Sequence, residues 1–227
     1  NYLRKKEAFT GIEDMTLLVP SYWLAERVKE SFLKDYPVRV IYNGIDLDIY
    51  RPTPSDFRKK YHLENKFVVL GVANVWVERK GLSTFLALAD RLGEEYKIVL
   101  VGLSEGQLAS LPANVLGLPR TDTPEKLAQI YTAADVFVNP SREETFGLTV
   151  AEAMACGTWP IVYADTACAE VVKKGAGTIV TGDLAEIEKV IRECRKKGIS
   201  GEMEEAVTFF SKQRFGQEVL AVYEEKR

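Results

Sequence analysis

Histidine and cysteine are scarce in this chain of 227 residues, which has one histidine and three cysteines. A histidine-based metal site and a Ser-His-Asp triad are therefore disfavoured. The single histidine, His62, lies in the polar stretch KKYHLENK, where we expect a surface side chain. Cys156, Cys168 and Cys194 are scattered and odd in number, which argues against a disulfide framework and predicts a reduced, cytoplasmic setting.

A basic excess and long apolar runs are also missing. Lys and Arg number 30 against 33 Asp and Glu, a net charge of −3, so nothing indicates a nucleic acid or a membrane surface as partner. The longest apolar runs have the length of a strand, so we expect no transmembrane segment. The opening stretch NYLRKKEAF also has no apolar signal-peptide core.

Short β-branched runs alternate with helical segments from residue 67 onward. The runs are apolar without strict alternation, as expected for strands that are covered on both faces. The pattern predicts an α/β fold with a doubly wound, parallel, Rossmann-like sheet. The predicted strands are FVVLGVA (67–73), YKIVLVGL (96–103), NVLGL (114–118), DVFVNPS (135–141), WPIVYA (159–164) and GTIV (177–180).

The chain divides into four segments. In residues 1–42, TLLVP and VRVIY predict two strands around the helix SYWLAERVKESFL, which starts at Ser21. Residues 43–57, NGIDLDIYRPTPSDF, have an Asn-Gly turn and two prolines and predict a connector. Residues 58–205 form the main domain, and residues 206–227 end in a predicted helix with Phe215, Val219, Val222 and Tyr223 on one side.

Ligands of open α/β sheets bind at the carboxyl ends of the strands. This rule selects the loops after Ala73, Leu103, Leu118 and Pro140.

The segment NPSREETFGLTVAEAMACG follows the last of these positions. A helix that begins near Phe146 or Gly147 offers unpaired N–H groups and a partial positive charge, which suit a phosphate group. Glu144 on the loop and Glu152 in the second turn more plausibly accept hydrogen bonds from sugar or ribose hydroxyls. Eight helical steps leave about 80° between two side chains, so the glutamates do not form an acid/base pair. The alternative is an ordinary strand-loop-helix with solvated glutamates.

The segment VANVWVERKGLS follows the first strand of the main domain. Lys80 directly precedes a helix that we expect to start at Gly81, so its ammonium adds charge to a second helix N-terminus at the same edge. Arg79 is a second candidate cation, or it pairs with Glu78 or Asp90. The alternative for Lys80 is an exposed loop lysine.

Other motifs are weaker. Asp46 and Asp48 in DLD resemble a metal-binding Asp-x-Asp, but their place in the connector favours turn chemistry. The glycines of VVLGVAN and LVGLSEG do not complete a dinucleotide fingerprint, so NAD binding is disfavoured.

Together these segments resemble the family-4 (group 1) glycosyltransferases with the GT-B fold over roughly residues 15–227. The resemblance is carried by VRVIYNGIDLDIYRP, RKGLSTFLALADRL, ACAEVV and the Glu-x7-Glu signature in IYTAADVFVNPSREETFGLTVAEAMACGTWPIV. It implies the C-terminal, donor-binding lobe of a GT-B fold, with residues 1–42 as a remnant of the N-terminal lobe and the last helix crossing back to it.

The resemblance also implies roles at the site. Glu144 would contact donor-sugar hydroxyls, Lys80 would neutralise the diphosphate, and Glu152 would hold the ribose hydroxyls. The backbone of Phe146, Gly147, Leu148 and Thr149 would meet the sugar and diphosphate, Arg79 would assist Lys80, and the loop at Pro119 and Arg120 would lie against the base. Transfer of a hexose-type sugar from a nucleoside diphosphate would then proceed with retention and without a metal or other cofactor.

Two positions depart from the family pattern. Val75 stands where the family often has an arginine, so either Arg79 supplies the second phosphate contact or Lys80 acts alone. The usual GTPV is GTWP, with Trp159 at the start of a strand.

Most of an acceptor lobe is missing from the pattern, so we expect no transfer by this chain alone. Polysaccharide, lipopolysaccharide or glycolipid synthesis is the family-level expectation, and neither acceptor, sugar nor base follows from the residues. The alternatives are a non-catalytic nucleotide-binding or assembly module, which would self-associate through the face left by the missing lobe, and a GT-B sugar-nucleotide epimerase.

Overall fold

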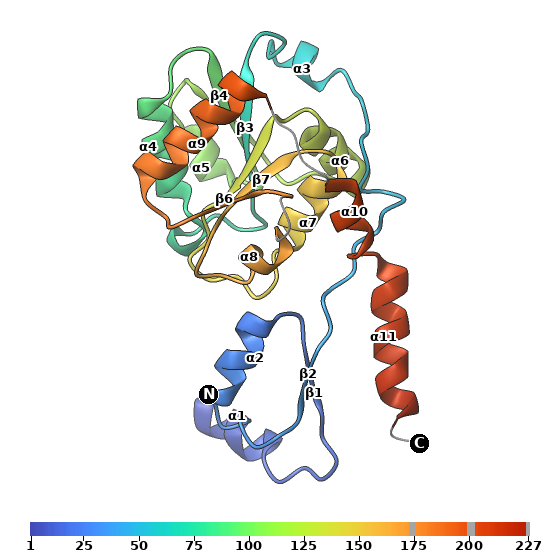
Figure 1. The fold of residues 1–227 in the computed structure, drawn as a ribbon. Coiled ribbons are helices and arrows are strands. Elements are labelled where there is room, and N and C mark those ends of the chain that lie inside the picture. Colours follow the sequence, from blue (N-terminus) through green and yellow to red (C-terminus); the bar gives the residue numbers. More distant parts are fainter. Residues whose placement is uncertain (173–175, 199–202, 226–227) are drawn as a thin grey trace.

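The chain folds into a large lobe and a small lobe joined by an extended connector (Figure 1). The computed structural model describes residues 1–172, 176–198 and 203–225. The large lobe contains a six-stranded sheet and the small lobe a two-stranded one. Within the described residues, every helix is too short or too polar to span a lipid bilayer.

The large sheet is parallel throughout, in the order β5-β4-β3-β6-β7-β8. The chain moves outward from β3 in one direction and from β6 in the other, so the order reverses between these two neighbours. The predicted doubly wound parallel sheet is therefore confirmed. The strands are β3 (Phe67–Val72), β4 (Tyr96–Val101), β5 (Val115–Leu118), β6 (Val136–Asn139), β7 (Trp159–Tyr163) and β8 (Thr178–Val180).

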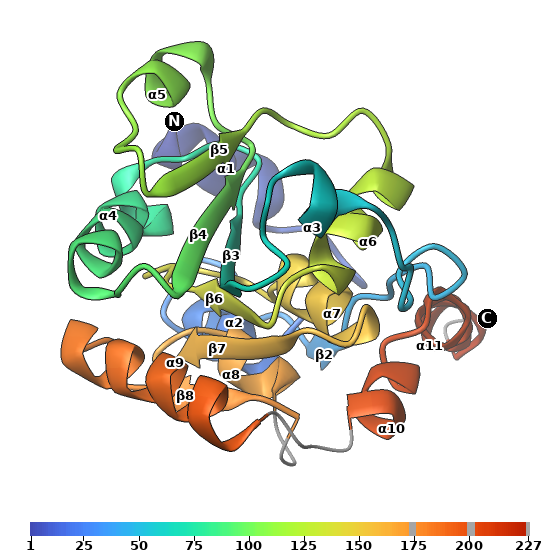
Figure 2. The same ribbon diagram turned by 90° about the horizontal axis from the view of Figure 1, so that it is seen from above.

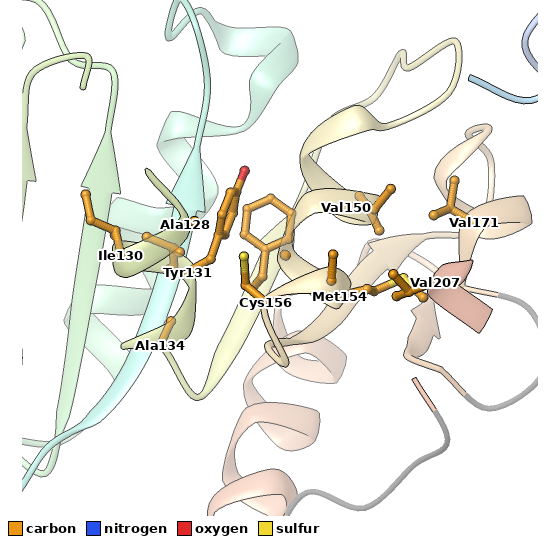
Figure 3. Packing of buried hydrophobic residues seen from close by; sticks show 14 of the residues in the cluster. Ala128, Ile130, Tyr131, Ala134, Val150, Met154, Cys156, Val171 and Val207 are labelled. Carbon is orange, nitrogen blue, oxygen red and sulfur yellow. The ribbon is translucent and has the colours of Figure 1, made fainter. Parts of the chain in front are cut away.

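Both faces of this sheet are buried, because successive strand residues point to opposite faces. In β3, Val68 and Leu70 belong to one buried cluster and Val69 to the other. Helices α4 (Leu82–Arg91) and α9 (Leu184–Lys197) cover the second face, and α6 (Pro124–Thr132), α7 (Leu148–Ala155) and α10 (Met203–Thr208) cover the first (Figure 2). Figure 3 shows Tyr131 of α6 and Val207 of α10 packing from either side against α7.

Helix starts follow the capping residues that the sequence offers. Thr123 accepts a hydrogen bond from Lys126 N at the start of α6, with Pro124 in the first turn. Ser104 forms a capping box with Gln107 at the start of α5 (Glu105–Ala109). Ser21 caps α2 (Tyr22–Lys29) rather than starting it, and this helix ends before the predicted Leu33. The large lobe also contains the short helix α8 (Cys168–Val171).

The small lobe consists of β1 (Leu17–Val19), α2 and β2 (Val38–Val40), with the two strands parallel. Three short helices were not predicted: α1 (Tyr2–Phe9), α3 (Phe57–Lys60) and α10. Helix α1 buries none of its residues. Its sequence accordingly lacks the apolar stripe from which a helix could have been predicted.

The last helix, α11 (Lys212–Glu224), leaves the large lobe and runs beside the small one (Figure 1). Ile45 of the connector forms a parallel bridge with Ser211 at its start, and Arg39 of β2 pairs with Glu225 at its end. The predicted apolar side is only partly correct. Phe215, Val219 and Val222 are half-buried, whereas Tyr223 is 67% exposed.

The structure differs from the prediction at the start of α4, and the ends of two predicted helices lie outside the described residues. A 3₁₀ turn, η1 (Glu78–Lys80), contains Lys80, and Gly81 caps α4 rather than starting it. Lys173 and Lys174 of the predicted helix CAEVVKK, and Lys226 of the last helix, lie outside the described ranges. His62 is exposed, as predicted.

Candidate functional site

A cavity of about 360 Å³ lies where β3 and β6 end. Residues that follow β3 (Ala73 and Asn74) and β6 (Pro140 and Ser141) line it. This is the reversal point of the strand order, where open α/β sheets bind their ligands. Of the four loops that the rule selected, those after Ala73 and Pro140 line this cavity, whereas those after Leu103 and Leu118 do not.

The start of α7 forms one wall of the cavity. Gly147, the N-cap of this helix, has φ of +98°, and a Cβ atom there would lie 2.7 Å from Cys168 Sγ. Only glycine meets both conditions without strain. The α7 N-terminus thereby faces the cavity with unpaired N–H groups, as its sequence predicts.

The start of α4 approaches the same cavity from β3. Gly81 has φ of +79°, and a Cβ atom there would lie 2.6 Å from the ring of Pro140 at the end of β6. This close approach brings two helix N-termini together beside one opening. Both helices add positive potential to it.

Lys80 and Glu144 meet in this cavity as an ion pair. Lys80 Nζ donates to Glu144 Oε2 at 2.5 Å, with the side chains 23% and 20% exposed. Partial burial reduces solvent screening of the two charges, so the pair is stronger than one on an open surface. The sequence predicts a ligand role for each residue separately, and the structure brings the two side chains together.

Glu152 lies deeper than Glu144 and faces α6 and the connector. Tyr131 Oη donates to Glu152 Oε2 at 3.0 Å, and Tyr50 of the connector also donates to this carboxylate. Burial raises the pKa of Glu152, although the two tyrosine hydroxyls act in the opposite direction. Glu152 does not line the cavity that holds Glu144. The two glutamates are thus separated, on the loop and in the second turn of α7.

The other predicted residues fall into two groups. Arg79 lines the cavity, as do Phe146, Gly147, Leu148 and Thr149. Phe146 is 1% exposed and packs against the rings of Tyr42 and Phe210. Arg120 is exposed on the loop after β5, two strands from β3, and does not line the cavity.

Five polar residues at the cavity were not singled out from the sequence. They are Asn43, Asn74, Asn139, Ser141 and Thr145. Asn139 is buried, and its Oδ1 accepts a hydrogen bond from Ser141 N at 3.1 Å. Asn139 could have been identified from the sequence, because it is a polar residue in the last position of a buried strand. Asn43 belongs to the Asn-Gly turn of the connector, and only the packing of the lobes brings it here.

The Asp-x-Asp of the connector forms a turn. Asp46 Oδ1 accepts from Asp48 N at 3.0 Å, and Lys212 Nζ donates to Asp46 Oδ2 at 2.5 Å. The Lys212 ammonium lowers the pKa of Asp46. In the part of the chain that the structure describes, no group of three or more His, Cys, Asp or Glu side chains is arranged to hold a metal ion.

Relatives with curated names are glycosyltransferases and glycolipid synthases. The family described as "Glycosyl transferases group 1" matches residues 54–206. D-inositol 3-phosphate glycosyltransferase 1 of Catenulispora acidiphila is 33% identical over 178 residues, 68% of this chain and 42% of the relative. Alpha-galactosylglucosyldiacylglycerol synthase of Streptococcus pneumoniae is 25% identical over 202 residues, 82% of this chain and 53% of the relative. The chain thus spans about half the length of these relatives.

Solved structures share the fold. Sucrose-phosphate synthase from Thermosynechococcus elongatus has a TM-score of 0.84 at 23% identity, over 99% of this chain and 61% of its own. Anabaena Alr3699/HepE in complex with UDP and glucose has a TM-score of 0.78 at 22% identity, over 91% and 62%. The predicted GT-B assignment is confirmed, and the chain belongs to the group 1 glycosyltransferase family.

Proposed function

We propose that this chain is the donor-binding half of a retaining glycosyltransferase that uses a nucleoside diphosphate sugar. The observation that carries the proposal is the Lys80–Glu144 pair in a cavity between the N-termini of α4 and α7. A cation and two helix N-termini suit a diphosphate, and a carboxylate beside them suits sugar hydroxyls.

The diphosphate would lie against Gly147 and the first turn of α7, within reach of Lys80. As the bond from the sugar's anomeric carbon to the diphosphate oxygen breaks, both bonding electrons leave with the diphosphate. Lys80 and the helix N–H groups would stabilise that charge, and Arg79 would supply the second cation. Lys80 would exchange its ion pair with Glu144 for one with the diphosphate. The Glu144 carboxylate would then accept a hydrogen bond from a sugar hydroxyl.

The nucleoside would extend from the diphosphate toward Glu152, which would accept from the ribose, and Arg120 would lie near the base. Because Tyr131 and Tyr50 already donate to Glu152, ribose binding requires Glu152 to share or exchange these hydroxyls.

Glucose is the first sugar to test, because a solved neighbour binds UDP-glucose and named relatives are diacylglycerol glucosyltransferases. The proposed pathway is glycolipid or polysaccharide synthesis. The reaction would need no metal, and the three free cysteines suit a cytoplasmic protein.

Titration calorimetry with UDP, GDP and ADP, each alone and as its glucose conjugate, tests the proposal. We expect one nucleotide to bind and its glucose conjugate to bind at least as well. A folded sample that binds none of the six compounds would contradict the proposal.

Transfer needs an acceptor held against the anomeric carbon, and this chain spans only about half the length of its named relatives. We therefore expect the 227-residue chain to bind the donor without transferring sugar to diacylglycerol or inositol 3-phosphate. Measurable turnover by this chain, followed by product chromatography, would contradict the second half of this expectation.

A second candidate is a non-catalytic nucleotide-binding module that assembles with itself. The exposed apolar side chains of α1 and α11, among them Leu3 (76%) and Leu220 (61%), favour an interface there.

A further inference from the structure

Glu170 in α8 joins the large lobe to the small lobe. Its carboxylate accepts three hydrogen bonds, all from residues 1–42. Tyr22 N and Trp23 N donate to it at 3.0 and 2.7 Å, and Tyr42 Oη donates at 2.9 Å. Figure 1 shows α2 and α8 facing each other across the junction between the lobes.

The chemistry of a helix N-terminus explains the first two bonds. The first N–H groups of α2 have no partner within the helix, and a carboxylate beside them also interacts favourably with the helix dipole. Ser21 Oγ accepts from Leu24 N, so the helix supplies one cap itself. Glu170 completes the cap from the other lobe, and undocking the lobes would expose both N–H groups again.

The same helix start also contacts the loop that carries Glu144. Ser21 is fully buried, and its Oγ donates to Thr145 O at 2.7 Å. From the other side, Ala167 N donates to Glu144 O at 3.2 Å. The loop 144–147 is therefore held between the start of α2 and the segment that leads into α8.

Tyr42 provides a second connection to the cavity. Its ring lies 6.1 Å from that of Phe146 in the same loop. The next residue, Asn43, lines the cavity. Glu170 thus holds Tyr22, Trp23 and Tyr42, which adjoin Ser21 at the loop 144–147 and Asn43 at the cavity.

We propose that Glu170 is a positioning residue that couples docking of the small lobe to the conformation of the loop 144–147. It lies outside the cavity and acts through Ser21 and Tyr42. The consequence for donor binding rests on the function proposed above, whereas the coupling between lobe and loop does not.

Site-resolved amide exchange by NMR tests the coupling without a ligand. In Glu170→Ala we expect faster exchange at Tyr22 and Trp23, which lose their acceptor. We also expect faster exchange at Val150 and Ala151, whose amides donate to Gly147 O. Glu170→Gln, which keeps one acceptor oxygen, should give intermediate rates and serves if the alanine variant does not fold.

Glu186→Ala is the matched control. The Glu186 carboxylate also accepts from a backbone amide, Thr181 N at 2.7 Å, but this contact is local, at the start of α9 within the large lobe. This variant should accelerate exchange at Thr181 and leave Val150 and Ala151 unchanged. Unchanged rates at Val150 and Ala151 in both Glu170 variants, or equal acceleration there in the control, would overturn the proposal.

Titration with UDP and UDP-glucose provides the second readout. We expect Glu170→Ala to weaken binding of both UDP and UDP-glucose about tenfold, the usual size of coupling between two sites, because the loop carries both Gly147 and Glu144, and we expect Glu186→Ala to leave both unchanged. Unchanged binding of both compounds in Glu170→Ala, or an equal loss in Glu186→Ala, would overturn the proposal. If the wild type binds neither compound, the proposed donor has failed and the exchange rates alone decide the role of Glu170.

Discussion

Lys80 and Glu144 form an ion pair in the cavity, with 2.5 Å between Lys80 Nζ and Glu144 Oε2. Glu152 is in a different position, because it is buried against two tyrosines and its ionised form is disfavoured there. Substitutions at these residues therefore test the proposed diphosphate position and the proposed nucleoside position separately.

Lys80→Ala should weaken UDP binding about 10- to 100-fold, since a hydrogen bond to a charged group contributes about 1.5–3 kcal/mol. Calorimetry measures the change. Lys66→Ala is the control, because Lys66 lies beside β3 at its other end and donates to Glu94 O. An equal loss in both variants would contradict the role of Lys80.

Glu144→Gln should preserve or improve UDP binding, because it releases Lys80 from its ion pair. The advantage of UDP-glucose over UDP should shrink, since the amide is a weaker acceptor for sugar hydroxyls. The two titrations on one variant check both changes. Weaker UDP binding would show that Glu144 supports the nucleotide rather than competing for Lys80.

Glu152→Gln should raise the melting temperature at pH 7.5. The folded-state pKa of Glu152 lies above its unfolded value, so the ionised carboxylate costs stability at neutral pH. That cost disappears as pH falls through the folded-state pKa, so the difference between variant and wild type should shrink on acidification. About 1 kcal/mol would move the midpoint by about 2–4 °C. Thermal melts of the wild type, of Glu152→Gln and of the exposed control Glu64→Gln, recorded from pH 7.5 downward, measure the difference in melting temperature. A lower melting temperature of Glu152→Gln at pH 7.5 would contradict the expectation.

At the scale of elements, the site depends on the convergence of α4 and α7. The N-cap of each helix is a glycine with positive φ that packs against a neighbouring segment, Gly81 on Pro140 and Gly147 on Cys168. Side chains at these glycines would push apart the segments that enclose the cavity.

Gly147→Ala should destabilise the fold by about 1–3 kcal/mol, because the alanine would be strained at φ of +98° and would meet Cys168 Sγ. Gly216→Ala in α11 is the control, since nothing lies within 4 Å of its Cβ position and alanine favours a helix. Urea unfolding followed by circular dichroism compares them. Equal stability of the two variants would contradict the packing argument.

At the scale of the whole molecule, the small lobe and α11 expose apolar surface. Tyr2, Leu3, Phe9, Leu220 and Tyr223 are each at least 50% exposed. Such surface favours association with another protein surface, whether a second copy or an acceptor lobe.

Sedimentation velocity over a concentration series tests self-association. We expect the sedimentation coefficient of the wild type to rise with concentration. The double variant Leu3→Glu, Leu220→Glu should show no rise, because the charges oppose burial of both positions. A wild type that stays monomeric throughout would argue against the assembly module.

Much of the fold and part of the site were predictable from local pattern. Apolar runs predicted the six large-lobe strands, because strands covered on both faces must be apolar throughout. Thr123-Pro124 and Ser21 marked helix starts through capping, which acts within a few residues. Lys80, Glu144 and Gly147 were found because strand ends and helix starts are local features that point to one sheet edge.

Tertiary structure decided what depends on contacts between distant segments. It set the strand order that brings β3 beside β6, and with it the meeting of Lys80 and Glu144 across 64 positions of sequence. It also placed Tyr131 against Glu152, Asn43 at the cavity and Glu170 under α2. Hydrogen bonds and ion pairs act over a few ångströms, whereas the sequence specifies only which residues are available to form them. The pairing itself follows from the packing of the two faces of the sheet and of the two lobes.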